Sequence, residues 1–429
     1  MWQRQFNDNF PLVLKVPLDN CQTFTILVIV ATGSKFETAQ EKGVSHFLEH
    51  MFFKGTTKRP TTLAISSELD AIGGEYNAFT SKESTAFYVK CVANQAEVAL
   101  DVLSDMLLNS LFASEEIDKE RGVIIEEINM YEDNPLMHLS DVFERVLYGD
   151  TPAGWDTAGS KETVNSLKRE NLIDYWQTHY GHSRAIICLA GNLSPDVDTL
   201  VNKYFSQWPT TFNFRDKLPV INQQTEPQLL VENKTTDQVH LALGVPAFPY
   251  GHPAELPTKL LAAILGGTMS SRLFLEIRER RGLAYYVRTE AETYTDSGYL
   301  VTEAGVKKES LPLAISMILQ EYKKLTTELV EESELSRVKK FLTGRLILGL
   351  EGSDDLARWY GYQQALRLGQ GDNQAILDTP QDYLTKLNSV SATDIREVAR
   401  QIFVDKGLNL AIIGPVANQN KLVSLLTLD

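Results

Sequence analysis

The order of strand-like and helical segments in the first half of the chain recurs in the second half. The run TILVIVA begins at Thr25, and its counterpart HLALGV begins at His240, which is 215 residues later. The run STAFYVKCV begins at Ser84, and its counterpart GYLVTEAG begins at Gly298, which is 214 residues later. Both pairs of runs are predicted to be strands, and each second strand leads into a helical pattern. A nearly constant offset indicates an internal duplication, so we predict two similar domains.

The segment between the two halves marks the predicted domain boundary. Residues 209–227 (PTTFNFRDKLPVINQQTEP) are polar, irregular and dotted with prolines. We therefore predict an N-terminal domain over residues 1–208, a linker over 209–227 and a C-terminal domain over 228–429. Strands alternate with helices but also pair through short polar turns. This pattern favours an α+β fold with two homologous domains, each a largely antiparallel sheet with packed helices.

Composition excludes several classes of protein. With 429 residues, 43% hydrophobic and 23% charged, the chain is typical of a soluble globular protein. The longest apolar run, residues 24–31, is too short for a membrane span. A net charge of −15 argues against a nucleic-acid partner, because phosphate binding needs concentrated Lys and Arg. The N-terminus lacks the apolar stretch of a secretory signal, so we expect a cytoplasmic protein unless a leader has been removed.

The motif HFLEH at residues 46–50 places metal-ligand side chains at helical spacing. In the segment 44–53 the apolar residues define one face of an amphipathic helix: Val44, Phe47, Leu48, Met51 and Phe52. At about 100° per residue, His46, Glu49 and His50 fall together on the opposite face. Two imidazoles one turn apart can share a metal ion, and a carboxylate beside them can deprotonate water. The pattern favours a zinc-hydrolase helix over its alternative, a solvated polar helix face.

A catalytic zinc site needs three protein ligands and one open position, so a third ligand is expected elsewhere. Residues 115–131 (EEIDKERGVIIEEINMY) are predicted to form a helix. Glu120 and Glu127 lie seven residues apart on a face that they share with Val123 and Ile124. Two carboxylates on an apolar stripe are unfavourable unless a positive group such as a metal compensates them. The alternative is that this face is a helix edge at the surface, where both carboxylates are solvated.

These residues match a known family. The chain resembles the inverted-motif (HxxEH) zinc peptidases, which include pitrilysin, insulin-degrading enzyme and the mitochondrial processing peptidase, and especially their short bacterial branch. In that family a glutamate ligand follows the HxxEH helix at about the distance that separates Glu127 from His50, which is 77 residues. The resemblance implies one Zn²⁺ per chain, held by His46, His50 and Glu127. It also implies Glu49 as the catalytic base and Glu120 as the second catalytic carboxylate near the metal.

The resemblance also implies substrate-binding residues in the first domain. The segment GGEYNAFTSKESTAFY, residues 73–88, resembles the family's edge strand. An extended peptide can pair with such an edge through main-chain hydrogen bonds. The resemblance therefore implies that Asn77, Ala78 and Phe79 line an extended peptide substrate.

A second substrate-binding segment is implied in the C-terminal domain. Residues 265–287 (LGGTMSSRLFLEIRERRGLAYYV) resemble the family's segment that contacts the scissile peptide, which implies substrate-binding roles for Arg278 and Tyr285. From the residues alone, Arg278 is a cation suited to the end of a helix, and Tyr285 is an ordinary strand aromatic. Tyr286, directly beside Tyr285, leaves open which hydroxyl points inward.

The second half lacks the metal-binding groups. The 215-residue offset places the apolar run 261–265 (LAAIL) opposite His46 to His50, and Leu342 opposite Glu127. The C-terminal domain is therefore expected to keep the architecture without binding zinc in this way. One domain would carry out the chemistry, and the other would contribute to substrate binding.

Together these features predict a zinc metalloendopeptidase that hydrolyses flexible oligopeptides. Two alternatives remain open: a non-catalytic structural or partner subunit of the same fold, and a zinc protein that only folds on its metal. Three candidate ligands rather than four argue against the last. The resemblance to short family members, which build a closable chamber from two chains, implies a homodimer or a heterodimer with an inactive paralogue. A bacterial cytoplasmic protein is expected.

Overall fold

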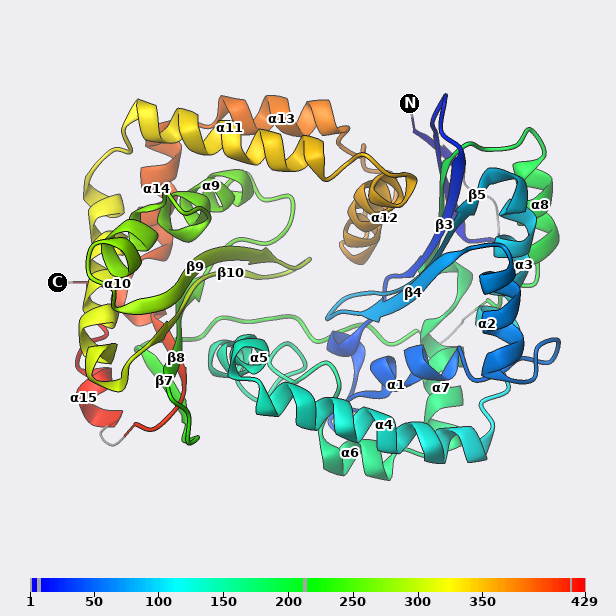
Figure 1. Cartoon of the computed structure of the whole chain (residues 1–429), viewed down its shortest axis with the longest axis horizontal. Helices are drawn as coiled ribbons and strands as arrows, with labels where there is room; N and C mark the ends of the chain where they lie inside the picture. The colour runs from blue at the N-terminus through cyan, green and yellow to red at the C-terminus, as the bar shows by residue number, and fades with distance from the viewer. Residues whose placement is uncertain (1, 6–8, 211–213, 417–418, 429) are drawn as a thin grey trace. The chain divides into compact units, whose positions relative to one another are not determined.

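A computed structural model describes the chain except for residues 1, 6–8, 211–213, 417–418 and 429 (Figure 1). The described residues form two compact units, and each unit is built around one sheet. The first unit comprises residues 1–129, 155–218 and 347–378, and the second comprises 130–154, 219–346 and 379–429. Each unit therefore draws on three separate stretches of the chain.

The described part of the first unit has a six-stranded sheet in the order β1-β2-β6-β3-β5-β4. Its strands are β1 Gln3–Gln5, β2 Leu12–Pro17, β6 Ala185–Gly191, β3 Thr23–Val30, β5 Thr85–Val92 and β4 Glu75–Thr80. β2 and β6 are parallel, whereas the other neighbours are antiparallel. Because β3 is covered on both faces, its sequence TFTILVIV is apolar almost without alternation.

Helices cover both faces of this first sheet. They are α1 Val44–Met51, α2 Thr62–Ala71, α3 Ala96–Asn109, most of α4 Ser114–Asp133, α6 Lys161–Ser166, α7 Arg169–His179, α8 Val197–Phe205 and α12 Ser353–Gly369. Helical turns are η1 Ser34–Phe36, η2 Ala93–Gln95 and η3 His182–Arg184. Ile26 and Val28 of β3 face the core that contains α1, α3 and α7. Leu27 and Ile29 face α12 on the other side.

The second unit repeats this sheet, in the order β7-β11-β8-β10-β9 among the described residues. Its strands are β7 Gln228–Glu232, β11 Asn409–Ile413, β8 Val239–Pro246, β10 Gly298–Val306 and β9 Ala284–Thr293. β7 and β11 are parallel, as β2 and β6 are in the first sheet, and the other neighbours are antiparallel. Strand for strand, the order matches β2-β6-β3-β5-β4, which confirms the predicted duplication and the α+β class.

Helices also cover the second sheet. They are α5 Pro135–Tyr148, α9 Glu255–Gly266, α10 Leu311–Thr327, α11 Glu332–Leu348, α13 Pro380–Ser389, α14 Ala392–Ile402 and α15 Gln419–Val423. Helical turns are η5 Lys308–Ser310 and η6 Asp405–Gly407, and η4 Phe274–Glu279 is a π-helical segment. Leu261 and Ile264 of α9 lie in the core on one face of the sheet, and α5 packs on the other face.

One helix of each unit follows directly in sequence after a helix of the other unit. α5 follows α4 in sequence but packs on β8 and β11, and α12 follows α11 but packs on β3 and β6 (Figure 1). Glycines allow both close approaches. A Cβ on Gly361 of α12 would lie 3.0 Å from Ile29, and one on Gly244 of β8 would lie 2.6 Å from Phe143 of α5. Larger residues at either position would push the helix away from its sheet.

Each compact unit combines stretches from both halves of the chain, whereas the predicted domains are contiguous ranges. The predicted boundaries 1–208, 209–227 and 228–429 describe the duplicated halves and stay a prediction. Residues 211–213 of the predicted linker lie outside the described residues, and the described remainder of 209–227 has no helix or strand. Within the described residues, no helix has the length and apolarity that crossing a membrane requires. Cys91 and Cys188 are buried free thiols.

Candidate active site

The helix α1 presents the HFLEH motif as its amphipathic sequence predicts. Val44, Phe47, Leu48 and Met51 are fully buried, whereas His46, Glu49 and His50 are only partly buried. The helix ends at Met51, two residues before the predicted end at Phe53. Phe52 is nevertheless buried, because it packs edge-on against Phe87 of β5. The buried face therefore fixes the direction in which the polar face points.

The start of α1 is fixed by a buried carboxylate that the sequence did not reveal. Glu37 accepts hydrogen bonds from the backbone N–H groups of Gly43 (2.8 Å) and Ser45 (2.9 Å). Gly43 has a φ of 89°, and a Cβ there would lie 2.4 Å from the carbonyl oxygen of Ala158. Both features hold the first turn of the helix, because a carboxylate satisfies free N–H groups and only glycine fits this backbone.

Three side chains from two helices converge at one point. Nε2 of His46 lies 3.3 Å from Nε2 of His50, and Oε2 of Glu127 on α4 lies 3.6 Å and 3.4 Å from these two nitrogens. Among the described residues, these three form the only group of at least three potential ligands within 4.8 Å of one another. Facing imidazole nitrogens beside a carboxylate need a proton or a metal ion between them, because their lone pairs repel one another. The donor set therefore fits a divalent ion with nitrogen and oxygen ligands.

Glu120 orients one of these imidazoles. Its Oε1 lies 2.8 Å from Nδ1 of His50, and its Oε2 lies 2.5 Å from Nζ of Lys54. With Nδ1 bonded to Glu120, Nε2 of His50 faces Glu127 and His46, and this is the usual arrangement of a metal-binding imidazole. Burial alone raises the pKa of Glu120, but the hydrogen bonds from His50 and Lys54 outweigh it and lower that pKa. Glu120 therefore remains a carboxylate near neutral pH.

The two imidazoles differ in their affinity for protons in the metal-free protein. Burial and the neighbouring His50 lower the pKa of His46 to about 4. Burial also opposes the charge on His50, but hydrogen bonds to Glu120 and Glu127 raise the pKa of His50 to about 9. His46 is thus neutral at pH 7 with a lone pair available. His50 carries the proton that a bound metal ion has to displace.

Glu49 lies on the same helix face, between the two histidines in sequence. Its Oε2 accepts a hydrogen bond of 2.6 Å from Oγ1 of Thr80, at the end of β4. Burial raises the pKa of Glu49, and the Thr80 hydrogen bond only partly opposes this shift. A carboxylate with a raised pKa is a better proton acceptor near neutral pH than an ordinary glutamate.

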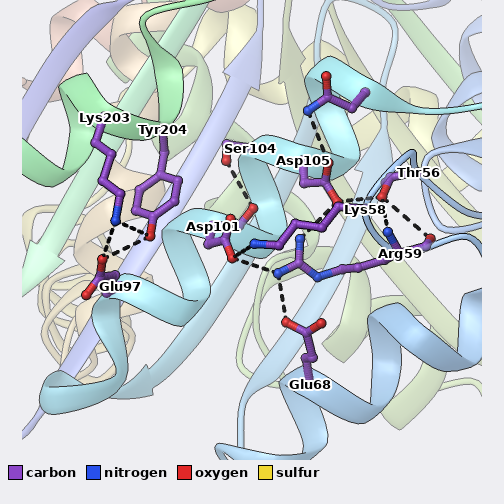
Figure 2. A network of polar contacts seen from close by, with 11 residues as sticks. Thr56, Lys58, Arg59, Glu68, Glu97, Asp101, Ser104, Asp105, Lys203 and Tyr204 are labelled. Carbon is purple, nitrogen blue, oxygen red and sulfur yellow. Dashed lines mark hydrogen bonds and ion pairs between the residues drawn. The ribbon is translucent and has the colours of Figure 1, made fainter.

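A buried arginine ties the chain after α1 to α3, which leads into α4. Arg59 is 1% exposed and donates to Asp105 (2.9 Å), Asp101 (2.8 Å) and Glu68 (2.7 Å), as Figure 2 shows. Thr56 also forms a β-bridge with Ser110, just after α3. These contacts link the helix that carries both histidines to the segment that precedes Glu120 and Glu127.

The predicted substrate-binding residues of the first unit lie on an edge strand. β4 pairs with β5 only, so its outer side is a sheet edge among the described residues. Asn77 is exposed, and its side chain accepts a hydrogen bond from the backbone N–H of Ala78. Phe79 stacks on Tyr362 of α12, with 5.7 Å between the ring centroids. The three residues share the free strand edge, although their side chains point to different faces.

The second unit brings Arg278 and Tyr285 together. The guanidinium group of Arg278, in the π-helical segment η4, lies 5.7 Å from the ring centroid of Tyr285. Tyr285 is 74% exposed, whereas the hydroxyl of Tyr286 lies 3.0 Å from Nδ1 of His240. Of the two neighbouring tyrosines, Tyr285 therefore has the more accessible side chain.

Comparison with known proteins shows the family to which the chain belongs. The family model described as Insulinase (Peptidase family M16) matches residues 15–160, and the model described as Peptidase M16 inactive domain matches residues 166–342. The chain belongs to peptidase family M16. An uncharacterized zinc protease of Bacillus subtilis is 34% identical over 94% of this chain and 97% of its own length. An uncharacterized zinc protease of Rickettsia felis is also 34% identical, over 94% and 95%.

Solved structures with the M16 fold are similar over almost their whole length. A protease from Helicobacter pylori matches with a TM-score of 0.87 at 22% identity, covering 97% of this chain and 99% of the other. A protein from Pseudomonas fluorescens, described as a peptidase M16 inactive domain, matches with a TM-score of 0.83 at 17% identity, covering 98% and 99%. At these identities the likeness concerns the fold, and it confirms the expected fold class.

The second half of this M16 chain has an apolar core where the first half has its polar cluster. Residues 261–265 of α9, the counterparts of His46 to His50, are all buried in the second core. No group of metal ligands is found there among the described residues. The architecture was thus duplicated, whereas the converging histidines and glutamates occur in the first unit.

Three residues of the candidate site were not identified from the sequence: Glu37, Lys54 and Thr80. Lys54 lies four residues after His50, and this helical spacing was a usable signal. Thr80 lies two residues after Ala78, so strand alternation places both side chains on one face. Nothing in the local sequence points to Glu37, because its bonds to Gly43 and Ser45 depend on the path of the intervening loop.

Proposed function

We propose that this chain is a zinc metalloendopeptidase that hydrolyses flexible oligopeptides. The observation that carries the proposal is the convergence of His46, His50 and Glu127 next to Glu49. The M16 family and the names of its relatives as zinc proteases support zinc as the ion. We further propose one zinc ion per chain, held by these three ligands with one position open to substrate.

Each polar residue has a distinct part in this proposal. A bound zinc ion supplies Lewis acidity, which makes water easier to deprotonate and a peptide carbonyl easier to attack. Glu49 takes the proton from water and returns it to the departing amine, as a general base and then a general acid. Glu120 is the second carboxylate of the site and keeps His50 oriented through its Nδ1.

Substrate binding involves both halves in this proposal. An extended peptide adds as a further strand along β4, next to Asn77, Ala78 and Phe79, so main-chain hydrogen bonds hold it irrespective of side chain. The need for an extended backbone explains a preference for flexible peptides. Arg278 and Tyr285 contact the substrate, a role that the family resemblance implies and that the exposure of Tyr285 permits. A homodimer, or a heterodimer with an inactive paralogue, in a bacterial cytoplasm remains part of the proposal.

The test combines metal analysis with cleavage of a quenched fluorescent peptide library. Wild type and Glu126→Gln should each contain one zinc ion per chain and cleave peptides. Glu127→Gln should lose both properties. Glu126 is the matched control, because it is the exposed neighbour of Glu127 on α4. Absence of zinc from wild type would reject the metal site, whereas zinc without cleavage would favour a non-catalytic subunit.

A further inference from the structure

The edge strand β4 ends on a residue whose hydroxyl contacts Glu49. Oγ1 of Thr80 donates to Oε2 of Glu49 over 2.6 Å. Hydrogen bonds to a charged carboxylate are stronger than bonds between neutral groups. Among the described residues, Thr80 is the only hydrogen-bond donor to this carboxylate, so Oε1 of Glu49 has no such partner.

The backbone around Thr80 is held firmly. Thr80 pairs with Thr85 at the end of the β4–β5 hairpin, and the backbone N–H of Ser81 donates to the carbonyl of Ser84 over 2.8 Å. The carbonyl of Ser81 in turn accepts from the backbone N–H of Ser34 over 3.1 Å. Because threonine is β-branched, its χ1 is restricted once the backbone is fixed. The hydroxyl therefore occupies a defined position relative to α1.

Strand alternation explains why this hydroxyl reaches α1. Tyr76, Ala78 and Thr80 share one face of β4, and Tyr76 and Ala78 pack in the core that includes α1. Phe79 points to the opposite face, where it stacks on Tyr362. A shift of β4 by one residue would exchange these faces and remove the hydroxyl from Glu49.

We propose that Thr80 is a positioning residue that holds the Glu49 carboxylate in its reactive orientation. This inference rests on the proposed function, in which Glu49 handles the proton of the attacking water. By bonding Oε2, Thr80 stops rotation of the carboxylate and leaves Oε1 free for that proton. Thr80 also belongs to the strand proposed to pair with the substrate, so one strand sets the position of both the peptide and the base.

Substitutions that remove or keep the Thr80 hydroxyl distinguish a positioning role from a purely structural role. Thr80→Val keeps the shape and the β-branch but removes the donor, so Glu49 should adopt other rotamers. A small misplacement of a reacting group lowers rates steeply, and we expect kcat to fall by about 10- to 100-fold. KM should stay within about twofold of wild type, because main-chain pairing along β4 is unchanged. Thr80→Ser restores the donor and should recover most of kcat.

The duplication provides a matched control. Thr293 ends β9 as Thr80 ends β4: each pairs with the first residue of the next strand, Gly298 and Thr85 respectively. By the 215-residue offset, Ile264 of α9 corresponds to Glu49 of α1, so Thr293 has no catalytic base to orient. Thr293→Val should therefore leave kcat and KM unchanged.

The experiment measures kcat and KM on a quenched fluorescent peptide and determines crystal structures of zinc-free wild type and Thr80→Val. We expect one Glu49 rotamer, bonded to Thr80, in wild type, and a different or divided rotamer in the variant. An unchanged Glu49 rotamer, an unchanged kcat, or a loss confined to KM would each overturn the inference. If Thr80→Val does not fold, Thr80→Ala carries the same expectation. Inactive wild type would instead refute the proposed function, while the zinc-free structures still report on Thr80.

Discussion

The ammonium group of Lys54 lies 2.5 Å from Oε2 of Glu120, whose other oxygen lies 2.8 Å from Nδ1 of His50. Glu120 is 5% exposed, so its charge depends on these two partners. Lys54 thereby supports a histidine that we propose as a zinc ligand, through one intervening carboxylate. Such outer partners fix the direction of the ligand nitrogen and its basicity.

Lys54→Met should therefore weaken zinc binding by about 10- to 100-fold, which is typical of the loss of an outer partner. Competition with a chromophoric chelator at fixed pH measures the affinity. The control is Lys58→Met on the same loop, where the lysine side chain is 57% exposed and forms a surface ion pair with Asp101. Equal affinities of wild type and Lys54→Met would show that Glu120 orients His50 without help.

Arg59→Met should destabilise the first unit strongly. The substitution leaves the buried Asp105 without its cation, whereas Asp101 keeps Lys58, and breaking a buried ion pair in this way costs about 3 to 5 kcal/mol. Urea denaturation of zinc-free protein, followed by fluorescence, gives the change in the free energy of unfolding. Lys203→Met, which removes an exposed partner of Glu97 (Figure 2), should have little effect. Similar losses in both variants would contradict the assignment of Arg59 as the anchor of this loop.

The pH dependence of stability should reflect His179, which is fully buried on α7. Burial, together with the charges of Arg215 and Arg184, lowers the pKa of His179 to about 3 from an ordinary value of 6.5. Between these two pH values the unfolded chain binds the proton and the folded chain does not. The stabilising effect of a neutral His179 is therefore complete above pH 6.5 and is lost progressively as the pH falls towards 3.

His179→Phe should flatten that dependence, by up to about 1.4 kcal/mol per pH unit for one proton. Phenylalanine suits the site, since His179 lies against Tyr175, Phe36 and Phe214. Unfolding free energies of both proteins at pH 4 to 7 test the prediction. Parallel pH curves would show that His179 does not contribute to acid sensitivity.

Tyr285→Phe should reduce kcat/KM for peptide cleavage by roughly 10- to 100-fold, somewhat less than the loss of an oxyanion-hole donor. Tyr286→Phe is the matched control, because its hydroxyl is bound to His240 in the second sheet and should not touch substrate. Steady-state kinetics on one peptide distinguish the two hydroxyls. The reverse pattern would assign the substrate contact to Tyr286.

Much of the fold follows from local patterns in the sequence. The nearly constant offset between the halves predicts two sheets of the same strand order, because the strand runs of the first half recur in the same order in the second half. The packing of α5 and α12 is different. The sequence of an amphipathic helix shows its apolar face but not which sheet that face will cover. Gly361 and Gly244 allow the close contacts of α12 and α5 with their sheets, but this role is recognisable only once those sheets are known.

The residues of the candidate site likewise fall into those that the sequence predicts and those that it does not. His46, Glu49 and His50 were predictable because one helix sets their relative directions, and the shared face of Glu120 and Glu127 was visible on α4. Thr80 and Glu37, which reach α1 from β4 and from a loop, were not predicted. Thr80 contacts Glu49 across 31 positions of sequence, and Glu37 reaches α1 through a loop whose path no periodicity describes.

The central claim is that Glu49 performs the proton transfer of a zinc peptidase, and the cleavage rate of zinc-loaded Glu49→Gln tests it most directly. Glutamine keeps the shape of the side chain but cannot accept the proton, and Glu49 is not one of the three proposed ligands. Wild type and variant should each bind one zinc ion per chain, while kcat of the variant falls by roughly 100- to 10,000-fold. Equal cleavage rates in the two zinc-loaded proteins would contradict this account.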